Sequence, residues 1–589
     1  MPQRLPPLRI ALAQVDTRVG DLEGNAAKLA HRIEEARDAG AELVLLPELS
    51  LTGYPPEDLL LKEHFLQAAG EALAALAADV EGIVAVVGYP ERTEDVFNAV
   101  AVIADGAVRA TYRKTRLWNY GVADEERYFQ AGEGGAVLDL GGARIGLTIC
   151  EDIWVPGPPA SDEAEAGASL IVNPSASPYH HGKGLERERM IVQRARDNLC
   201  AVAFCNLVGG QDELVFDGHS LVVDHEGAVL ARGPQFEEAL VVANVDLQAA
   251  LTARLRDTRL RPPARQALPE VRSLGRLERP DRPGVESLGG DVAPLLEPEA
   301  EVYAALRLGL RDYVEKNGLG HVVIGLSGGI DSTLTALVAV DALGTDKVTA
   351  VVMPSRWSSE GTQSDARALA ANLGIACLDV PIAPAMGIYE QMLADTFEGR
   401  DPDITEENLQ ARIRGNLLMA LSNKFGWLVL TTGNKSETSV SYSTLYGDTA
   451  GGFAVIKDVP KTLVYRLVDF RNARDGDHPV PRSIIERPPS AELRPDQKDT
   501  DSLPDYDTLD AILEAYVEED ADREQLLLRG FPEEAVDRVI ELVDRAEYKR
   551  RQAPPGIKIT PRAFGRDRRM PITNAYRVAG RARSARTPA

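Results

Sequence analysis

The segment His321-Val322-Val323-Ile324-Gly325-Leu326-Ser327-Gly328-Gly329-Ile330-Asp331-Ser332 is followed by a second apolar run, residues 333–340. This order predicts a β-strand, a glycine turn and an α-helix. A helix N-terminus attracts anions through its free backbone N–H groups, and two glycines let a phosphate approach the backbone closely. Asp331 adds a carboxylate that can hold a divalent cation beside that phosphate. The segment therefore predicts a phosphate-binding loop, and the alternative is an ordinary strand-to-helix turn that contains two glycines.

The glycine spacing narrows the type of phosphate-binding loop. No Gly-Lys-Ser/Thr closes the segment, so it is not a Walker A motif, and it lacks the three-glycine spacing of a dinucleotide-binding Rossmann turn. It resembles the pyrophosphate loop of the ATP pyrophosphatases, which adenylate a substrate and release pyrophosphate. The loop alone does not identify that substrate, because related loops serve several kinds of synthetase.

Length, charge and cysteine content limit the classes of function. A chain of 589 residues is too long for one hydrophobic core, so we expect two large domains. A formal net charge of -25 argues against general nucleic-acid binding, which requires a basic surface. The four cysteines lack metal-binding spacing and are few, as in a reducing compartment. No apolar signal core or membrane-length apolar run is present, so we expect a cytoplasmic enzyme without membrane contact.

The chain divides into two different α/β patterns. Residues 1–251 alternate apolar strands with helices, residues 252–295 are rich in Arg, Pro and Gly and predict a connecting segment, and residues 296–589 form the second pattern. The second pattern includes an acidic helical insert near residues 507–548 and a basic C-terminal segment, with a disordered tail expected from residue 579. Predicted strands are residues 8–14, 43–47, 83–89, 99–104, 144–150, 170–173, 201–206, 219–223, 321–326, 348–352 and 427–431, and predicted helices include residues 25–39 and 185–198.

Three chemically active residues follow strands in the first region. Glu48, Lys114 and Cys150 each stand where an apolar run meets a loop, which is where α/β folds collect catalytic groups. Glu48 can take the thiol proton as general base, Lys114 can stabilise the thiolate and an oxyanion, and Cys150 can attack a carbonyl to form a thioester. Each residue taken alone has another interpretation. Cys150 could be a small buried apolar residue, and Glu48 and Lys114 could be solvated charges or an ion pair.

Together with their neighbours, these residues resemble the nitrilase, or carbon–nitrogen hydrolase, family across roughly residues 8–250. The triad stands in Leu46-Pro47-Glu48-Leu49, Tyr112-Arg113-Lys114 and Thr148-Ile149-Cys150-Glu151-Asp152. The resemblance implies a four-layer αββα sandwich. It also implies Glu48 as the base, Lys114 as the oxyanion stabiliser and Cys150 as the nucleophile of an amidase.

The second region suggests which amide is cleaved. An amidase fused to an ATP-pyrophosphatase-like domain suggests glutamine hydrolysis that supplies ammonia. Tyr120, Ser177 and Lys183 match positions that contact glutamine in glutaminases of this type. The alternative interpretation is that these three are loop residues without ligand contact. Ala123 departs from relatives that usually have Phe there, which bears on the shape of the pocket and not on the triad.

Further segments occur in a fixed order downstream of the phosphate loop. They include Thr431-Thr432-Gly433-Asn434-Lys435-Ser436-Glu437, Tyr446-Gly447-Asp448, residues 451–462, residues 486–493 and residues 561–569. The ordered set resembles the glutamine-dependent NAD synthetases from residue 8 to about 577. The resemblance implies a doubly wound parallel sheet of the Rossmann-like, ATP pyrophosphatase kind in the second domain. Rival interpretations are a nitrilase joined to a tRNA- or amino-acid-modifying adenylase, and a scaffold protein with degenerate domains.

The resemblance also implies a reaction. ATP adenylates the nicotinate carboxylate of deamido-NAD, and ammonia from L-glutamine then displaces AMP to give NAD, with pyrophosphate and L-glutamate as the other products of this final step of NAD biosynthesis. A homo-oligomer and a closed ammonia passage within or between subunits are expected, because free ammonia would be protonated and lost.

The same resemblance assigns residues of the second domain to three ligands. Asp331 and Glu437 are implied as ligands of Mg²⁺. Implied contacts to deamido-NAD are Asn408, Glu437 and Lys549. Arg414 and Lys461 are further candidates, and the alternative interpretation of both is that they are surface cations without ligand contact. Whether Glu437 serves the metal, the dinucleotide or both stays open. Implied ATP contacts are Gly325, Leu326, Ser327, Gly328, Gly329, Ile330, Asp331, Ser332 and Thr432.

Overall fold

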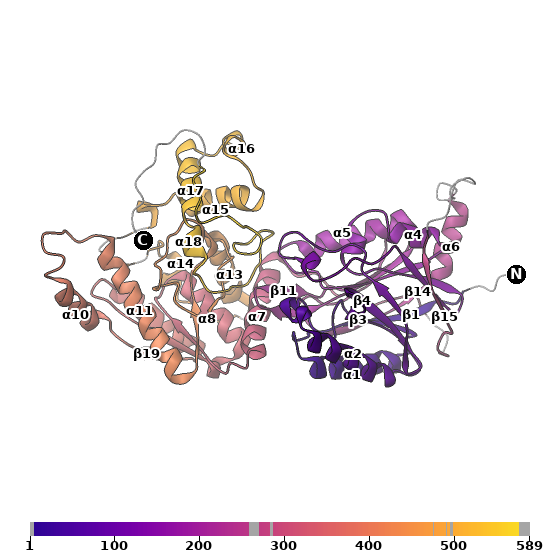
Figure 1. Cartoon of the computed structure of the whole chain (residues 1–589). Coiled ribbons are helices and arrows are strands. Elements are labelled where there is room, and N and C mark those ends of the chain that lie inside the picture. The colour runs from indigo at the N-terminus through magenta and orange to yellow at the C-terminus, as the bar shows by residue number, and fades with distance from the viewer. Residues whose placement is uncertain are drawn as a thin grey trace. The chain divides into compact units, whose positions relative to one another are not determined.

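The computed structural model describes residues 5–257, 270–282, 287–474, 476–490, 492–494, 497 and 499–576. The chain divides into two compact units, Met1–Gln211 with Val215–Leu296 and Asp212–Leu214 with Glu297–Ala589. Both units mix helices and strands, as the sequence predicts (Figure 1). The tail predicted to be disordered lies outside the described residues.

Two seven-stranded sheets form the centre of the first unit, counted over its described residues. The central strands of each sheet pair in parallel and antiparallel pairs flank them, while the edge strand β15 of the second sheet again pairs in parallel. The first sheet has the order β16 (Gly289–Gly290), β14 (Ala239–Val245), β1 (Leu8–Gln14), β2 (Leu43–Leu45), β3 (Val84–Arg92), β4 (Val96–Ala104) and β5 (Ala107–Arg113). The second has the order β13 (Val229–Arg232), β12 (Leu221–Val223), β9 (Ala201–Asn206), β8 (Leu170–Ser175), β7 (Ala143–Leu147), β6 (Ala136–Leu140) and β15 (Arg272–Leu277).

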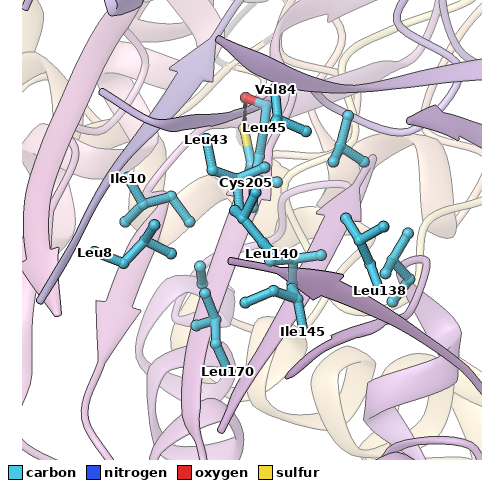
Figure 2. Packing of buried hydrophobic residues seen from close by; sticks show 14 of the residues in the cluster. Leu8, Ile10, Leu43, Leu45, Val84, Leu138, Leu140, Ile145, Leu170 and Cys205 are labelled. Atoms are coloured by element: carbon cyan, nitrogen blue, oxygen red, sulfur yellow. Dashed lines mark hydrogen bonds between the residues drawn. The ribbon is translucent and has the colours of Figure 1, made fainter. Parts of the chain in front are cut away.

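The alternation of side chains along β1 explains why the sheets stack. Leu8, Ile10 and Leu12 point into the core between the two sheets, whereas Ala11 and Ala13 point to the opposite face. Figure 2 shows the inter-sheet core, in which apolar side chains of both sheets meet and the Cys205 thiol donates a hydrogen bond at 3.3 Å to the Leu45 carbonyl.

Helices cover the outer face of each sheet. Helices α1 (Leu22–Asp38) and α2 (Glu63–Ala78) cover the first sheet, and α4 (Ala160–Glu165) and α5 (Lys183–Asn198) cover the second (Figure 1). The predicted αββα sandwich is therefore confirmed.

The segment predicted as a connection also contributes to the first unit. Strand β15 pairs in parallel with β6, and β16 pairs antiparallel with β14. Helix α6 (Leu247–Arg256) precedes them. Their alternation of apolar and polar residues is weak because both strands lie at sheet edges and are largely exposed, so the sequence pattern did not reveal them. Residues 258–269 and 283–286 of this segment lie outside the described residues.

A parallel sheet organises the second unit. Among the described residues its order is β19 (Ala376–Asp379), β18 (Val348–Val352), β17 (Val322–Gly325), β20 (Leu428–Thr431) and β21 (Phe453–Ala454), and every pairing is parallel. The chain adds β18 and β19 on one side of β17 and then returns to add β20 on the other. Such a switch leaves a crevice at the carboxyl ends of the two central strands, where α/β proteins bind ligands.

Helices and a separate helical cluster complete the second unit. Helix α11 (Ile404–Phe425) packs through Ile413 and Leu418 on the sheet, and α7 (Pro298–Lys316), α8 (Ile330–Leu343) and α13 (Lys461–Arg474) pack together. The predicted acidic insert forms α15 (Tyr506–Leu513), a π-helical turn (Glu514–Glu518), α16 (Arg523–Leu528) and α17 (Glu533–Arg545), which pack around an apolar core that Val440 and Phe564 complete, and α18 (Glu547–Arg550) follows. None of the helices in the described part of the chain is both long and apolar enough to span a bilayer.

Candidate active sites

The first candidate site lies where β2, β5 and β7 end. Glu48, Lys114 and Cys150 follow these strands, and their exposed fractions are 1%, 0% and 3%. Lys114 Nζ donates a hydrogen bond to Glu48 Oε1 at 2.6 Å. The charges of both residues act on the Cys150 thiol. The structure thus brings together, away from water, the three residues that the sequence predicts as a catalytic triad.

Glu48 is held in place through both of its oxygens. Asn98 Nδ2 donates to Oε1 at 2.7 Å, alongside Lys114, and the backbone N–H of Ala176 donates to Oε2 at 3.0 Å. Because the side chain is already fixed, Glu48 loses little conformational entropy when it takes a proton. Its arrangement suits a general base.

The surroundings of Cys150 determine its resting protonation state. Burial raises the pKa of the thiol well above its usual value, Glu48 raises it further, and Lys114 only partly opposes the rise. Burial alone would lower the pKa of Lys114, but Glu125 and Glu48 raise it well above its usual value. These shifts favour the charged form of Lys114 and the protonated form of the Cys150 thiol, so a nucleophilic role for Cys150 would require a base that removes its proton.

Glu125 is a site residue that the sequence reasoning missed. It lies in a short 3-10 turn (Glu125–Arg127), is 4% exposed, and accepts hydrogen bonds from Lys114 Nζ at 2.9 Å and from the Trp118 backbone at 2.8 Å. Its neighbours Asp124 and Glu126 are exposed, so the run of charges is typical of a solvated loop. Only its burial distinguishes Glu125, and no periodicity in the sequence reveals it.

Cys150, the candidate nucleophile, stands at a sharp turn that Asp152 stabilises. Cys150 has a φ of 41°, which is unusual for a residue with a side chain, and the α3 turn (Glu151–Trp154) begins directly after it. The buried Asp152 accepts hydrogen bonds from the Ile149 N–H at 2.9 Å and from the Thr115 hydroxyl at 2.7 Å. It therefore ties the segment before Cys150 to the segment after Lys114.

The three candidate glutamine contacts lie around α3 and the Glu48 loop. The Tyr120 hydroxyl donates to Glu151 at 3.0 Å, and Lys183 Nζ lies 4.0 Å from the centre of the Trp154 ring. Both partners, Glu151 and Trp154, belong to the α3 turn that begins directly after Cys150. Ser177 is buried, follows the Ala176 that holds Glu48, and donates its backbone N–H to Asn206 at 2.9 Å. Ala123 is buried, so its departure from Phe concerns the interior of this loop.

The second candidate site is a cavity of about 310 Å³ in the second unit. It opens at the carboxyl ends of β17 and β20, at the switch point of the sheet. Arg414, Glu437 and Lys461 also line it. All predicted ATP contacts lie on its wall, namely Gly325, Leu326, Ser327, Gly328, Gly329, Ile330, Asp331, Ser332 and Thr432.

The phosphate loop is held in shape by its own polar groups. The Ser332 hydroxyl donates to the Gly329 carbonyl at 3.0 Å, and the Ser327 hydroxyl accepts the Gly329 N–H at 3.2 Å. Arg487 donates to the Gly328 carbonyl at 3.2 Å. Gly328 has a φ of +81°, and a Cβ there would lie 2.2 Å from the Thr362 carbonyl oxygen, so the position requires glycine.

The two carboxylates expected to hold a metal share one ammonium. Lys461 Nζ donates to Asp331 Oδ2 at 2.5 Å and to Glu437 Oε1 at 3.1 Å. Burial raises the pKa of Glu437 above its usual value, and the Lys461 ammonium opposes the rise. Carboxylate oxygens facing a cavity suit Mg²⁺, which takes one or two carboxylates together with phosphate oxygens. No group of three or more His, Cys, Asp or Glu that could hold a metal alone occurs among the described residues.

Of the remaining candidates for binding the dinucleotide, some line the cavity and others do not. Asn408 and Lys549 do not line this cavity: Asn408 accepts the hydroxyl of Thr444, a wall residue, at 2.8 Å, and Lys549 Nζ donates to the Ser443 carbonyl at 2.7 Å. Arg414 does line it, and burial lowers its pKa to about 10. Lys461 is 3% exposed, so the alternative of a surface cation is wrong for this residue.

Comparison with known proteins assigns nearly the whole chain to one family. Residues 9–254 match the carbon-nitrogen hydrolase family, and residues 302–553 match the NAD synthase family. The glutamine-dependent NAD(+) synthetase of Thermotoga maritima is 48% identical over 97% of this chain and 99% of its own length. That of Aquifex aeolicus is 46% identical over 97% of this chain and 100% of its own. A solved structure of the Acinetobacter baumannii glutamine-dependent NAD+ synthetase in complex with adenosine diphosphate is 41% identical, with 96% of this chain and 99% of that chain covered and a TM-score of 0.73. The chain therefore belongs to the family of the glutamine-dependent NAD(+) synthetases.

Proposed function

We propose that this chain converts deamido-NAD to NAD with ATP and with ammonia taken from L-glutamine, releasing AMP, pyrophosphate and L-glutamate. One observation carries the proposal. A single chain holds both a buried thiol–carboxylate–ammonium set and a phosphate-loop cavity. The first has the chemistry to release ammonia, and the second has the chemistry to activate a carboxylate that ammonia then attacks.

The first unit is proposed to hydrolyse glutamine through Cys150. Glu48 takes the thiol proton as sulfur attacks the side-chain carbonyl, because the thiol rests protonated. Lys114 stays charged and stabilises the oxyanion that forms. Glu48 returns the proton to the leaving ammonia, and water then releases glutamate from the thioester. Tyr120, Ser177 and Lys183 are proposed to hold the glutamine.

The second unit is proposed to activate the nicotinate carboxylate. A carboxylate is a poor electrophile, so its attack on the α-phosphorus of ATP, with loss of pyrophosphate, supplies AMP as a leaving group. The loop from Gly325 to Ser332 and Thr432 would bind ATP. Mg²⁺, which Asp331 and Glu437 would hold, offsets phosphate charge during the transfer. Asn408, Glu437 and Lys549 are proposed to bind deamido-NAD, with Arg414 as a further candidate.

Ammonia would travel between the sites through a closed passage, within one subunit or between subunits. The two activities on one chain motivate this proposal. Addition of an ammonia scavenger should leave glutamine-driven NAD synthesis largely intact, and a collapse of that synthesis would contradict the passage. A homo-oligomer and a cytoplasmic location stay predictions.

The rival interpretations lose support. A tRNA- or amino-acid-modifying adenylase does not fit relatives that match nearly the whole chain and are named NAD(+) synthetases. A degenerate scaffold predicts the loss of site residues, whereas the triad and the phosphate loop are complete and buried or cavity-lining.

Cys150→Ala tests the division of labour. NAD formation from deamido-NAD and ATP should disappear with glutamine as the nitrogen donor and persist with ammonium chloride. Cys377→Ala, which removes an exposed thiol in the second unit, should leave both activities unchanged. Glutamine use by Cys150→Ala at the rate of the unaltered protein would reject Cys150 as the nucleophile. Loss of both activities in a folded variant would contradict two separate sites.

A further inference from the structure

Lys461 places an ammonium between the two carboxylates proposed to hold magnesium. Its Nζ lies 2.5 Å from Asp331 Oδ2 and 3.1 Å from Glu437 Oε1. All three residues line the ATP cavity, and Lys461 is 3% exposed. The protein itself thus supplies a cation at the place where the reaction needs a divalent one.

The three charged groups are brought together by the starts of three helices. Asp331 is the second residue of α8, Glu437 belongs to the short helix α12 (Lys435–Ser439), and Lys461 is the first residue of α13. The Ser436 hydroxyl accepts the Lys461 N–H at 2.8 Å, and Asp510 accepts the Thr462 N–H at 2.9 Å. The backbone of Lys461 is therefore fixed, while its long side chain can rotate about four bonds.

Local helix stability does not explain a lysine at this position. The N-terminus of a helix carries partial positive charge, so a cation in the first turn is unfavourable. Asp331 and Glu437 offset that cost, and Asn434 Nδ2 satisfies the second oxygen of Asp331 at 2.8 Å. The ammonium is best explained by its two carboxylate partners, and these are the residues with a proposed role in metal binding.

The ammonium and a divalent cation compete for the same oxygens. A metal at Asp331 and Glu437 would lie within a few ångströms of Nζ, where the repulsion between a single and a double positive charge is strong in a partly buried site. One cation must leave when the other arrives. The triphosphate of ATP in the same cavity would give the displaced ammonium a new partner.

We propose that Lys461 is a displaceable counter-ion: it holds Asp331 and Glu437 together in the empty site, and it moves to the phosphates when the metal–nucleotide complex enters. The inference rests on the proposed function only in taking Asp331 and Glu437 as metal ligands. It gives Lys461 a role in ordering ligand entry. When the metal binds without nucleotide, it must displace the ammonium although no phosphate is present as a new partner. The metal alone therefore binds weakly.

The test measures the binding of Mn²⁺, an EPR-visible substitute for Mg²⁺, to the full chain without nucleotide. Lys461→Met removes the charge and keeps the length of the side chain, so Mn²⁺ alone should bind at least tenfold more tightly. At saturating Mn²⁺, the same variant should bind the non-cleavable analogue α,β-methylene-ATP at least tenfold more weakly. These opposite directions distinguish a counter-ion from a merely structural residue, whose loss would weaken both.

Three further variants complete the experiment. Lys461→Arg keeps the charge and should bind Mn²⁺ alone as weakly as the unaltered protein. Lys461→Gln, which keeps a hydrogen-bond donor for Asp331, repeats the test if Lys461→Met lowers the thermal stability of the second unit. Lys424→Met removes an exposed lysine of α11 and should change neither affinity.

The result that overturns the proposal is an unchanged or weaker affinity for Mn²⁺ alone in a folded Lys461→Met or Lys461→Gln variant. The titration involves no turnover. Failure of NAD synthesis by the unaltered chain would instead count against the proposed function, so the two ideas can fail separately.

Discussion

The Glu125 carboxylate accepts a hydrogen bond from Lys114 Nζ at 2.9 Å, and neither side chain is exposed to solvent by more than a few per cent. Lys114 therefore faces two carboxylates, Glu125 and Glu48, although the proposed reaction needs only one base. The second carboxylate has a physical purpose. Glu125 gives the Lys114 ammonium a second anionic partner, so the ammonium is not paired with Glu48 alone.

Glu125→Gln tests this arrangement, because it removes one negative charge and keeps the size of the side chain. Lys114 then pairs with Glu48 alone and weakens it as a base, so glutamine hydrolysis should fall by about tenfold to 100-fold. Glutamate release measures the effect, and NAD synthesis driven by ammonia should stay unchanged. The control is Glu126→Gln at the exposed neighbouring position. Equal glutaminase rates in the two variants would contradict a role for Glu125.

Asp152→Asn is expected to loosen the turn that carries Cys150, the proposed nucleophile. The fully buried carboxylate accepts the Ile149 N–H, the Thr115 hydroxyl and the Arg116 N–H, the last at 2.8 Å. Asparagine offers one acceptor oxygen and turns an amide N–H toward the other donors. Unfolding of the first unit should therefore cost about 3 kcal/mol less.

The glutaminase kcat of Asp152→Asn should fall by about tenfold or more, because Cys150 and Lys114 lose their common anchor. Chemical unfolding followed by the fluorescence of the first unit measures stability, and steady-state glutamate release separates kcat from KM. Asp162→Asn on α4 is the matched control. A variant with normal stability but an altered KM alone would contradict the positioning role.

The elements that the sequence predicted best are those with a strong apolar pattern. The predicted strands 8–14, 201–206 and 348–352 match β1, β9 and β18 residue for residue. Their residues are nearly all buried, so the apolar run and the strand coincide. Edge strands β15 and β19 were missed because their exposed residues have little apolar alternation.

In the candidate sites, residues within short motifs could be predicted from the sequence, and residues whose roles depend on long-range contacts could not. Glu48, Cys150 and the phosphate loop follow largely buried strands, and each of them, like Lys114 after the more exposed β5, stands in a short motif that the sequence displays. Glu125 and Asp152 could not be predicted, since their roles depend on contacts between segments far apart in sequence, such as Asp152 with Thr115. Lys461 was proposed only as a contact to the dinucleotide, because no sequence pattern shows that its ammonium reaches Asp331.

Acid should weaken the attachment of α5, the helix that begins at Lys183. Glu188 on this helix accepts hydrogen bonds from Arg232 at 2.8 and 2.9 Å, and from His219 when that ring donates. Burial opposes ionisation of Glu188, but the hydrogen bonds of His219 and Arg232 prevail and lower its pKa to about 2. A lowered pKa in the folded state means that ionised Glu188 stabilises the fold above pH 4.5, and that this stabilisation is lost as the pH falls toward 2.

The comparison of Glu188→Gln with the unaltered protein measures this contribution. At pH 7 the variant should be less stable by about 1 to 2 kcal/mol, since water partly screens the pair. The difference should shrink as the pH is lowered from 4.5 toward 3, because protonation removes the same charge from the unaltered protein. Urea unfolding at several pH values provides the data. A stability difference that does not vary with pH in this range would show that the ion pair is not its source.

Adjacent glycines in the phosphate loop should respond differently to the same substitution. Gly328 has a φ of +81°, and an added Cβ would lie 2.2 Å from the Thr362 carbonyl oxygen. Gly329 has a φ of -91°, and its added Cβ would meet only the flexible Ser327 hydroxyl at 3.3 Å. Gly328→Ala must therefore move the backbone of α9 (Glu360–Leu373) or of the loop, and should destabilise the second unit by about 2 kcal/mol or more. Gly329→Ala should cost less than about 1 kcal/mol. Thermal unfolding of the second unit measures both variants, and equal losses would show that the shape of the loop does not depend on the conformation of Gly328.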